Sequence, residues 1–87
     1  DRDIALVVKQ SVRVGDLLNA ISSVSPYIER VDLFDIYEGE QIEQGYKSVA
    51  FSIRLQPQER TFSDNDIKTI VNSVLEKALS EFGAKLR

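Results

Sequence analysis

The sequence contains neither cysteine nor histidine. Thiol catalysis, imidazole catalysis and zinc sites built from these residues are therefore excluded. The 4 glycines stand at positions 15, 39, 45 and 83, too far apart for a loop that cradles phosphate. No apolar run approaches the roughly 20 residues that span a bilayer, and we expect neither a membrane span nor a signal peptide. Carboxylate chemistry and binding functions stay open.

The chain is long enough, at 87 residues, to bury one hydrophobic core. Its composition, 43% hydrophobic and 29% charged, is typical of a folded domain. We therefore expect a single domain over residues 1–87. The chain starts at Asp1 without a methionine, which indicates a fragment of a longer chain, although tag removal or processing would leave the same end. The absence of cysteine is typical of cytoplasmic proteins.

The charge balance is acidic. The sequence has 14 acidic and 11 basic residues and a formal net charge of −3. Proteins that bind nucleic acids usually carry a basic balance, so the global charge argues against RNA as a ligand.

Alternation of apolar residues predicts four strands. They are expected at residues 2–9, 29–38, 46–55 and 84–87. The first strand is apolar on both faces, which is typical of the middle of a sheet. A loop at residues 39–45 joins the second and third strands, and Pro57 prevents the third strand from continuing.

Helical spacing of apolar residues predicts two helices. The first begins near Val14 and ends before Pro26, because the residue before a proline avoids the helical region. The second covers residues 63–82, where Ser63 and Asp66 form a short capping box and the following glycine is placed to end the helix.

The element order is therefore β-α-β-β-α-β, the split βαβ arrangement of ferredoxin-like α+β domains. We expect a four-stranded antiparallel sheet with strand order 4-1-3-2 and two helices on one face. The other face of the sheet is expected to be open to solvent.

Alternation in the third strand separates two faces. The residues expected under the helices are Val49, Phe51, Ile53 and Leu55. The residues expected on the open face are Ser48, Ala50, Ser52 and Arg54.

On the second strand, Phe34 and Ile36 are expected to point inward, and Asp35 and Tyr37 to lie on the open face. Strict alternation puts Asp32 inside, unless a bulge or the strand end changes the register. In the last strand, Leu86 is expected to point inward.

The open face combines an acid, a phenol, small residues and an arginine. Small side chains allow a flat nucleobase to approach the strands, Tyr37 is suited to stack on the base, and Asp35 to accept hydrogen bonds from its edge. A half-covered sheet also exposes a polar face to water when it binds nothing. Spacing alone does not separate these two interpretations.

Residues 47–53, KSVAFSI, partly match the third-strand consensus of RNA-recognition motifs. In those domains the consensus aromatic residues lie on the open face. Here Val49 and Phe51 share their face with the expected core, so this match fails.

Acidic residues are frequent from the second strand into the loop: Glu29, Asp32, Asp35, Glu38, Glu40 and Glu43. Sites for divalent ions cluster their oxygen ligands more densely. We therefore expect a solvated hairpin, with no metal site, no cofactor and no catalytic residue in this domain.

Four segments of the sequence together resemble one known family. They are RDIALVV at residues 2–8, LFDIYEGEQIEQGYKSVAF at residues 33–51, ERTFSDNDI at residues 59–67 and GAKLR at residues 83–87. They are similar to the ferredoxin-fold anticodon-binding domain at the C-terminus of the bacterial phenylalanyl-tRNA synthetase β subunit. The resemblance covers essentially the whole chain.

This resemblance implies a function. The parent enzyme charges tRNA-Phe with phenylalanine using ATP and magnesium, in a cytoplasmic heterotetramer of α and β subunits. The domain itself is implied to be non-catalytic and to bind the anticodon stem-loop. A single-chain organellar synthetase with the same terminal module is a second parent of this kind.

The family's anticodon contacts correspond to Asp35, Tyr37, Ser48 and Ala50 in this sequence. The basic residues implied for phosphate contacts are Arg2, Lys47, Arg54 and Arg87. The family often has a basic residue or a histidine where Tyr46 stands, so a local contact is expected to differ. The acidic balance implies modest RNA affinity for the isolated domain, with other domains of the parent adding to it.

Two other ferredoxin-like classes are alternatives to this family. A regulatory domain of the ACT type, which binds a small molecule or a partner protein, needs a glycine-containing turn after the first strand, and Gly15 is the only candidate. An acylphosphatase-like enzyme needs an arginine-bearing phosphate loop and an asparagine on a partner strand. Only Arg13 is available, and the third strand has no asparagine.

Overall fold

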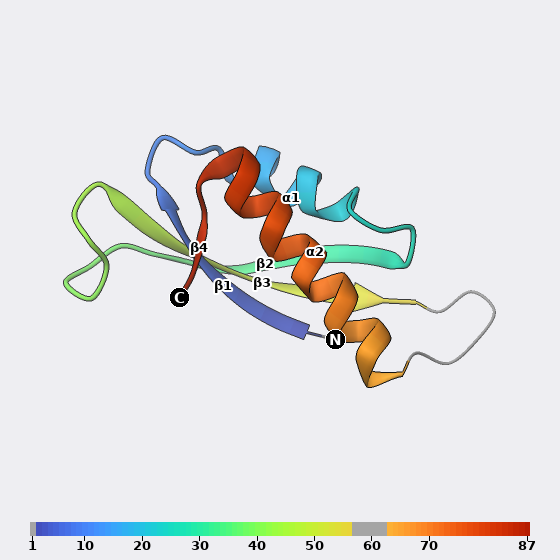
Figure 1. Cartoon of the computed structure of the whole chain (residues 1–87). Helices are drawn as coiled ribbons and strands as arrows, with labels where there is room; N and C mark the ends of the chain where they lie inside the picture. Colours follow the sequence, from blue (N-terminus) through green and yellow to red (C-terminus); the bar gives the residue numbers. More distant parts are fainter. Residues whose placement is uncertain (1, 57–62) are drawn as a thin grey trace.

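The computed structural model describes residues 2–56 and 63–87. The elements are β1 (Arg2–Lys9), α1 (Val14–Ser22), β2 (Ile28–Tyr37), β3 (Tyr46–Leu55), α2 (Asp64–Phe82) and β4 (Lys85–Leu86). Figure 1 shows their arrangement along the chain. The predicted order of elements is confirmed. Pro57 and residues 59–62 of the third resemblance segment lie outside the described residues.

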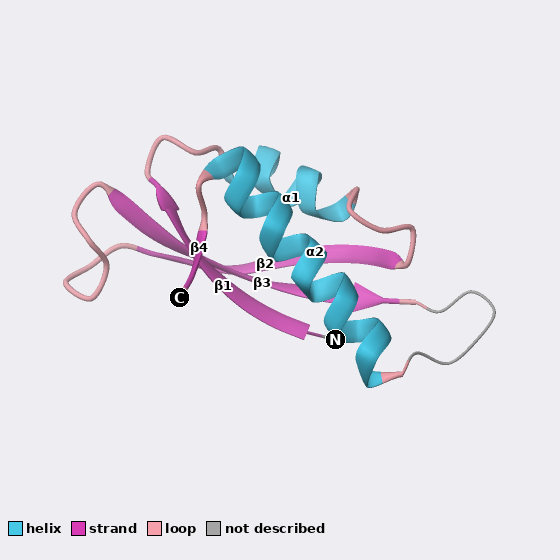
Figure 2. Ribbon diagram, in the orientation of Figure 1, coloured by secondary structure: helices cyan, strands magenta, loops and turns pink. Residues whose placement is uncertain are grey.

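The four strands form one antiparallel sheet in the order β2-β3-β1-β4. Both helices cover the same face of this sheet (Figure 2). The predicted α+β ferredoxin-like fold, with strand order 4-1-3-2, is confirmed. β1 and β3 are central, whereas β2 and the short β4 form the edges, and this position decides how well each strand is covered.

The hydrophobic core lies between the helices and the two central strands. The fully buried hydrophobic side chains among the described residues are Leu6, Val8, Leu17, Ile21, Val49, Phe51, Ile53, Val74 and Ala78. The predicted inward face of β3 is confirmed. The assignment of Phe51 to the core also confirms that the third strand does not present aromatic residues in the manner of an RNA-recognition motif.

Local sequence sets both ends of α2. The backbone N–H of Asp66 donates to Ser63 Oγ at 3.1 Å, and the Ser63 N–H donates to Asp66 Oδ2 at 3.1 Å. This reciprocal capping box satisfies two amides at the helix start. Gly83 follows the helix with φ of 65°, a left-handed conformation that favours glycine. The predicted start and end of the helix are confirmed.

A β-bulge lies in β2 between Leu33 and Asp35. Phe34 is the extra residue, and its side chain is 60% exposed. The prediction that Phe34 points inward is therefore wrong, because a bulged residue leaves the alternation of its strand. Asp32 and Asp35 pair with Ser52 and Ala50, so both acids lie on the open face.

Helix-facing positions on the edge strands are poorly covered. Ile36 pairs with Val49 and shares its face, as predicted, but its side chain is exposed. Leu86 pairs with Leu6 and shares its helix-facing side, as predicted, but it is 64% exposed. Both lie in edge strands, which the helices cover less completely than the central strands.

Candidate nucleic-acid interface

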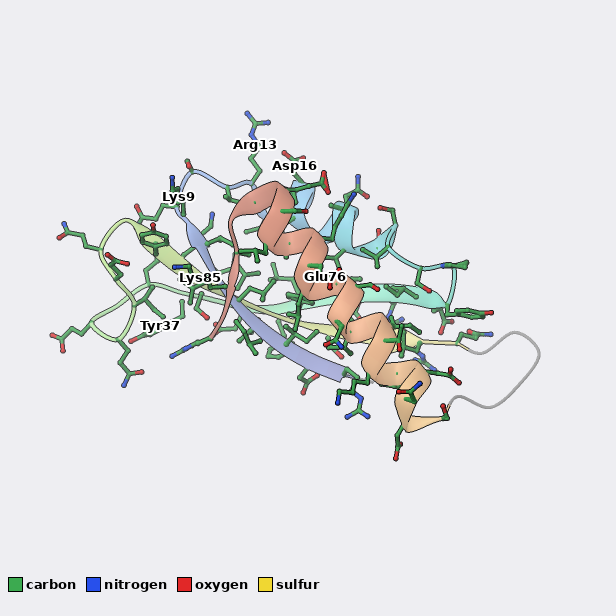
Figure 3. All side chains as sticks on the ribbon, in the orientation of Figure 1. Lys9, Arg13, Asp16, Tyr37, Glu76 and Lys85 are labelled. Carbon is green, nitrogen blue, oxygen red and sulfur yellow. The ribbon has the colours of Figure 1, made fainter. Side chains whose placement is uncertain are left out.

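The open face of the sheet is built from rows of residues that lie side by side across the strands. The first row contains Tyr37 on β2, Ser48 on β3, Val7 on β1 and Lys85 on β4. Directly opposite residues in antiparallel strands point to the same face. Tyr37 and Lys85 therefore lie at opposite edges of one row. Figure 3 labels both side chains.

The next row contains Asp35, Ala50 and Ala5, and the backbone N–H of Arg87 donates to the carbonyl oxygen of Ala5 at 2.9 Å. Small residues therefore occupy the central strands in this part of the sheet. We call this surface the platform, formed by Ala5, Val7, Ser48, Ala50 and Ser52. A flat ring can approach the backbone closely over such residues.

Charge is distributed unevenly around the platform. The acids Asp32 and Asp35 lie on the β2 side, and Asp3 lies on β1 opposite Ser52. Lys9, Lys85 and Arg87 lie on the β1 and β4 side. The net charge of −3 therefore conceals a local basic edge next to the platform.

Asp35 has no ion-pair partner among the described residues, and its side chain is exposed. Asp32, by contrast, accepts from Arg30 Nε at 2.7 Å. The carboxylate of Asp35, on the same strand as Tyr37, is therefore available to accept hydrogen bonds from a ligand.

Ser48 lies on the open face by register but is only 2% exposed. Arg87 Nη1 donates to Ser48 Oγ at 3.2 Å, and the Arg87 guanidinium carbon stands 5.4 Å from the centroid of the Tyr37 ring. The Arg87 side chain therefore reaches from the β4 edge to the far side of the platform, and it contacts two of the predicted site residues.

Arg54 also lies on the open face, in the row of Arg30. Its Nε is 3.2 Å from Glu29 Oε2, and both side chains are about half exposed. Exposed ion pairs of this kind contribute little to stability and exchange readily with other anions. Arg54 stays a candidate for a phosphate contact at the end of the platform opposite Tyr37.

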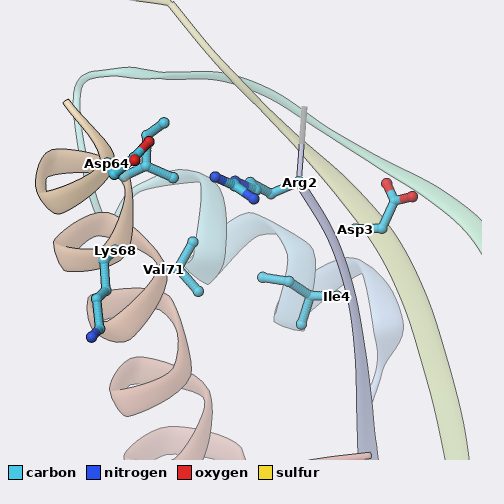
Figure 4. Close-up of a pocket in the computed structure, with 7 residues that line it drawn as sticks. Arg2, Asp3, Ile4, Asp64, Lys68 and Val71 are labelled. Atoms are coloured by element: carbon cyan, nitrogen blue, oxygen red, sulfur yellow. The ribbon is translucent and has the colours of Figure 1, made fainter. Parts of the chain in front are cut away.

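Arg2 and Lys47 lie on the other side of the sheet. Arg2 pairs with Ile53 and lines a cleft against α2 together with Asp64 and Lys68 (Figure 4). The ammonium of Lys47 donates to two backbone carbonyl oxygens in the β1–α1 connection, at 3.1 and 2.7 Å. The sheet thus separates these two residues from the other predicted contacts.

Sequence reasoning missed Lys85 and Lys9 as candidates. The signal for Lys9 was present, because it has the same parity as Ala5 and Val7 on the first strand. Lys85 lies in a strand of only 2 residues, too short for alternation to reveal its face. The register against Val7 supplies that information.

Three further features of the described residues bear on other functions. Within residues 2–56 and 63–87, no group of three or more acidic residues is placed to hold a metal ion. None of the helices described is long and apolar enough to cross a membrane. Gly15 lies in the first turn of α1 with open space around it, away from any turn that contacts the platform.

Comparison with known families agrees with this geometry. The model of the ferredoxin-fold anticodon binding domain matches residues 1–87. The chain belongs to this family. The resemblance inferred from the four sequence segments is thereby confirmed at the level of the family.

Several longer proteins are similar in sequence to this chain. Three are the phenylalanine–tRNA ligase beta subunits of Geobacillus kaustophilus, Pseudoalteromonas translucida and Fusobacterium nucleatum. They are 42%, 41% and 37% identical over 87, 87 and 86 residues. Each alignment covers 99% of this chain but only 11% of the relative. The chain therefore spans about a ninth of the length of these relatives.

Proposed function

We propose that this chain recognises the anticodon stem-loop of tRNA-Phe, as a module of a phenylalanine–tRNA ligase beta subunit. The observation that carries the proposal is the platform itself, bordered by Tyr37 and Asp35. It occupies the helix-free face of a domain whose family is described as anticodon binding. Residue alternation and family resemblance each lead to this surface.

In the proposed mechanism an unstacked base of the loop lies against the platform. The Tyr37 ring stacks on the base, and Asp35 accepts a hydrogen bond from an amino or ring N–H group on the base edge. The small side chain of Ala50 leaves room for the ring between them. Phosphates are repelled by the acids on β2 and attracted by the lysines on the opposite side, so the RNA backbone runs along the β1 and β4 edge.

The chemistry of the parent enzyme belongs to its other domains in this proposal. They charge tRNA-Phe with phenylalanine, using ATP and magnesium, in a cytoplasmic assembly of α and β subunits. This chain contributes neither a catalytic residue nor a cofactor site. Linkage to other tRNA-binding domains raises the effective concentration of RNA at the platform, which is compatible with a net charge of −3.

The proposal is tested by titrating this chain with the tRNA-Phe anticodon stem-loop at low salt. A stem-loop of the same length with exchanged anticodon bases serves as the control. We expect tighter binding to the cognate loop, since the platform contacts bases. Equal affinity for both loops, in this chain and again in the full-length protein, would contradict the proposal.

A second prediction concerns the RNA backbone. Lys85→Gln is expected to lower the slope of log K against log salt by about 0.7, the value for one released counterion on a single strand. Preference for the cognate loop should remain, because phosphate contacts carry no base information. Lys68→Gln, on α2, makes the same change in net charge and should leave the slope unchanged. Equal slope changes in the two variants would show that the salt dependence follows the net charge of the protein and not a phosphate contact of Lys85.

A further inference from the structure

The Tyr37 ring has two close neighbours. The Arg87 guanidinium carbon lies over the ring, 5.4 Å from its centroid, within the range of cation–π contacts. Gly39 lies near the tip of the ring, where an added Cβ atom would stand 2.7 Å from Tyr37 Cζ and closer still to the hydroxyl oxygen. The present ring position therefore requires a glycine at 39. Tyr37 is the last residue of β2, beside the loop that leads to β3, and is labelled in Figure 3.

Arg87 is itself fixed at several points. Its backbone N–H donates to the Ala5 carbonyl oxygen at 2.9 Å, which anchors it to β1. Its Nη1 donates to Ser48 Oγ at 3.2 Å, and its Nη2 to Gln41 Oε1 in the hairpin loop at 3.4 Å. The planar guanidinium presents its donors in a rigid fork, so these bonds also fix the group beside Tyr37.

We propose that Arg87 and Gly39 are positioning residues, which hold the Tyr37 ring in the orientation used for base recognition. The inference rests on the proposed function of the platform and names what controls its selectivity. Arg87 acts here through Tyr37 and Ser48 and not through a phosphate. Its positive charge matters for the ring contact more than for attraction of the RNA backbone.

The contacts of Arg87 favour this role over a phosphate contact. Two of its nitrogens already donate to side-chain oxygens, and its guanidinium carbon lies over an aromatic ring. The side chains of Lys9 and Lys85, by contrast, have no ion-pair or hydrogen-bond partner among the described residues. Exposed lysines are suited to track phosphates, whereas a bound arginine is suited to orient its neighbours.

The first measurement uses the free protein. NMR spectra of the Tyr37 ring are compared for the wild type, Arg87→Gln and Gly39→Ala. We expect both substitutions to shift the Tyr37 ring signals and to leave those of Tyr27 and Tyr46 unchanged. The matched controls are Arg13→Gln, at the start of α1, and Gly15→Ala, where a Cβ meets nothing within 4 Å. Unchanged Tyr37 signals in Arg87→Gln would overturn the inference, whether or not the chain binds RNA.

The second measurement is the ratio of affinities for the cognate and exchanged stem-loops. Arg87→Gln is expected to lower this ratio about 2- to 5-fold, the value of one cation–π contact, with the salt slope unchanged. Gly39→Ala, which removes no charge, is expected to lower the ratio in the same direction. A salt slope reduced by about 0.7 with an unchanged ratio would identify Arg87 as a phosphate contact and overturn the inference.

Discussion

Tyr37→Ala is expected to weaken binding of the tRNA-Phe anticodon stem-loop by about 5- to 150-fold. The estimate corresponds to the loss of one base–aromatic stack, roughly 1–3 kcal/mol. Tyr37 is an aromatic residue that borders the platform, and 36% of its surface is exposed even with Arg87 over the ring. Fluorescence titration at constant salt measures the change.

Tyr37→Phe is the matched control, because it keeps the ring and removes only the hydroxyl. Its affinity should remain within about 3-fold of the wild type if stacking dominates. Thermal unfolding should show that both variants retain the fold, since Tyr37 is not part of the core. Wild-type affinity in Tyr37→Ala would remove Tyr37 from the interface and move recognition to another surface.

Phe51→Ala is expected to lower the free energy of unfolding by about 3–5 kcal/mol. Phe51 has 0% exposed surface and lies on central strand β3, beneath both helices. The substitution leaves a cavity that the surrounding side chains cannot fill completely. In a small domain this is a large share of a total stability of about 5–15 kcal/mol. Urea unfolding followed by circular dichroism measures the difference.

Phe34→Ala removes the same atoms from a neighbouring strand and serves as the control. Phe34 is 60% exposed on the bulge of β2, so its loss should change stability by no more than about 0.5 kcal/mol. A comparable loss of stability in the two variants would contradict the bulged, exposed position of Phe34. The pair therefore tests the position of Phe34, which alternation wrongly assigned to the inward face.

Much of the fold could be predicted because its signals are local. Alternation along β3 separates Val49 and Phe51 from Ser48 and Ala50 without reference to any other strand. The capping box at the start of α2 depends on residues three positions apart. Such patterns can be read without knowledge of the tertiary fold, because they reflect the residue periods of strand and helix.

The candidate site was predicted only in part. Tyr37, Asp35 and Ala50 follow from the strand period and the family resemblance. The contacts of Arg87 with Tyr37 and Ser48 join residues 50 and 39 positions apart in the sequence. No local pattern encodes such a pair, because it depends on β4 lying beside β1.

By itself the sequence determined which residues alternate, where the helices start and end, and to which family the chain belongs. Only the tertiary structure decided that Phe34 lies outside the core, that Leu86 stays exposed and that the Arg87 side chain reaches Tyr37. The reason is physical. Periodicity assigns a side chain to a face of its own element, whereas burial and contact depend on what another element places over that face.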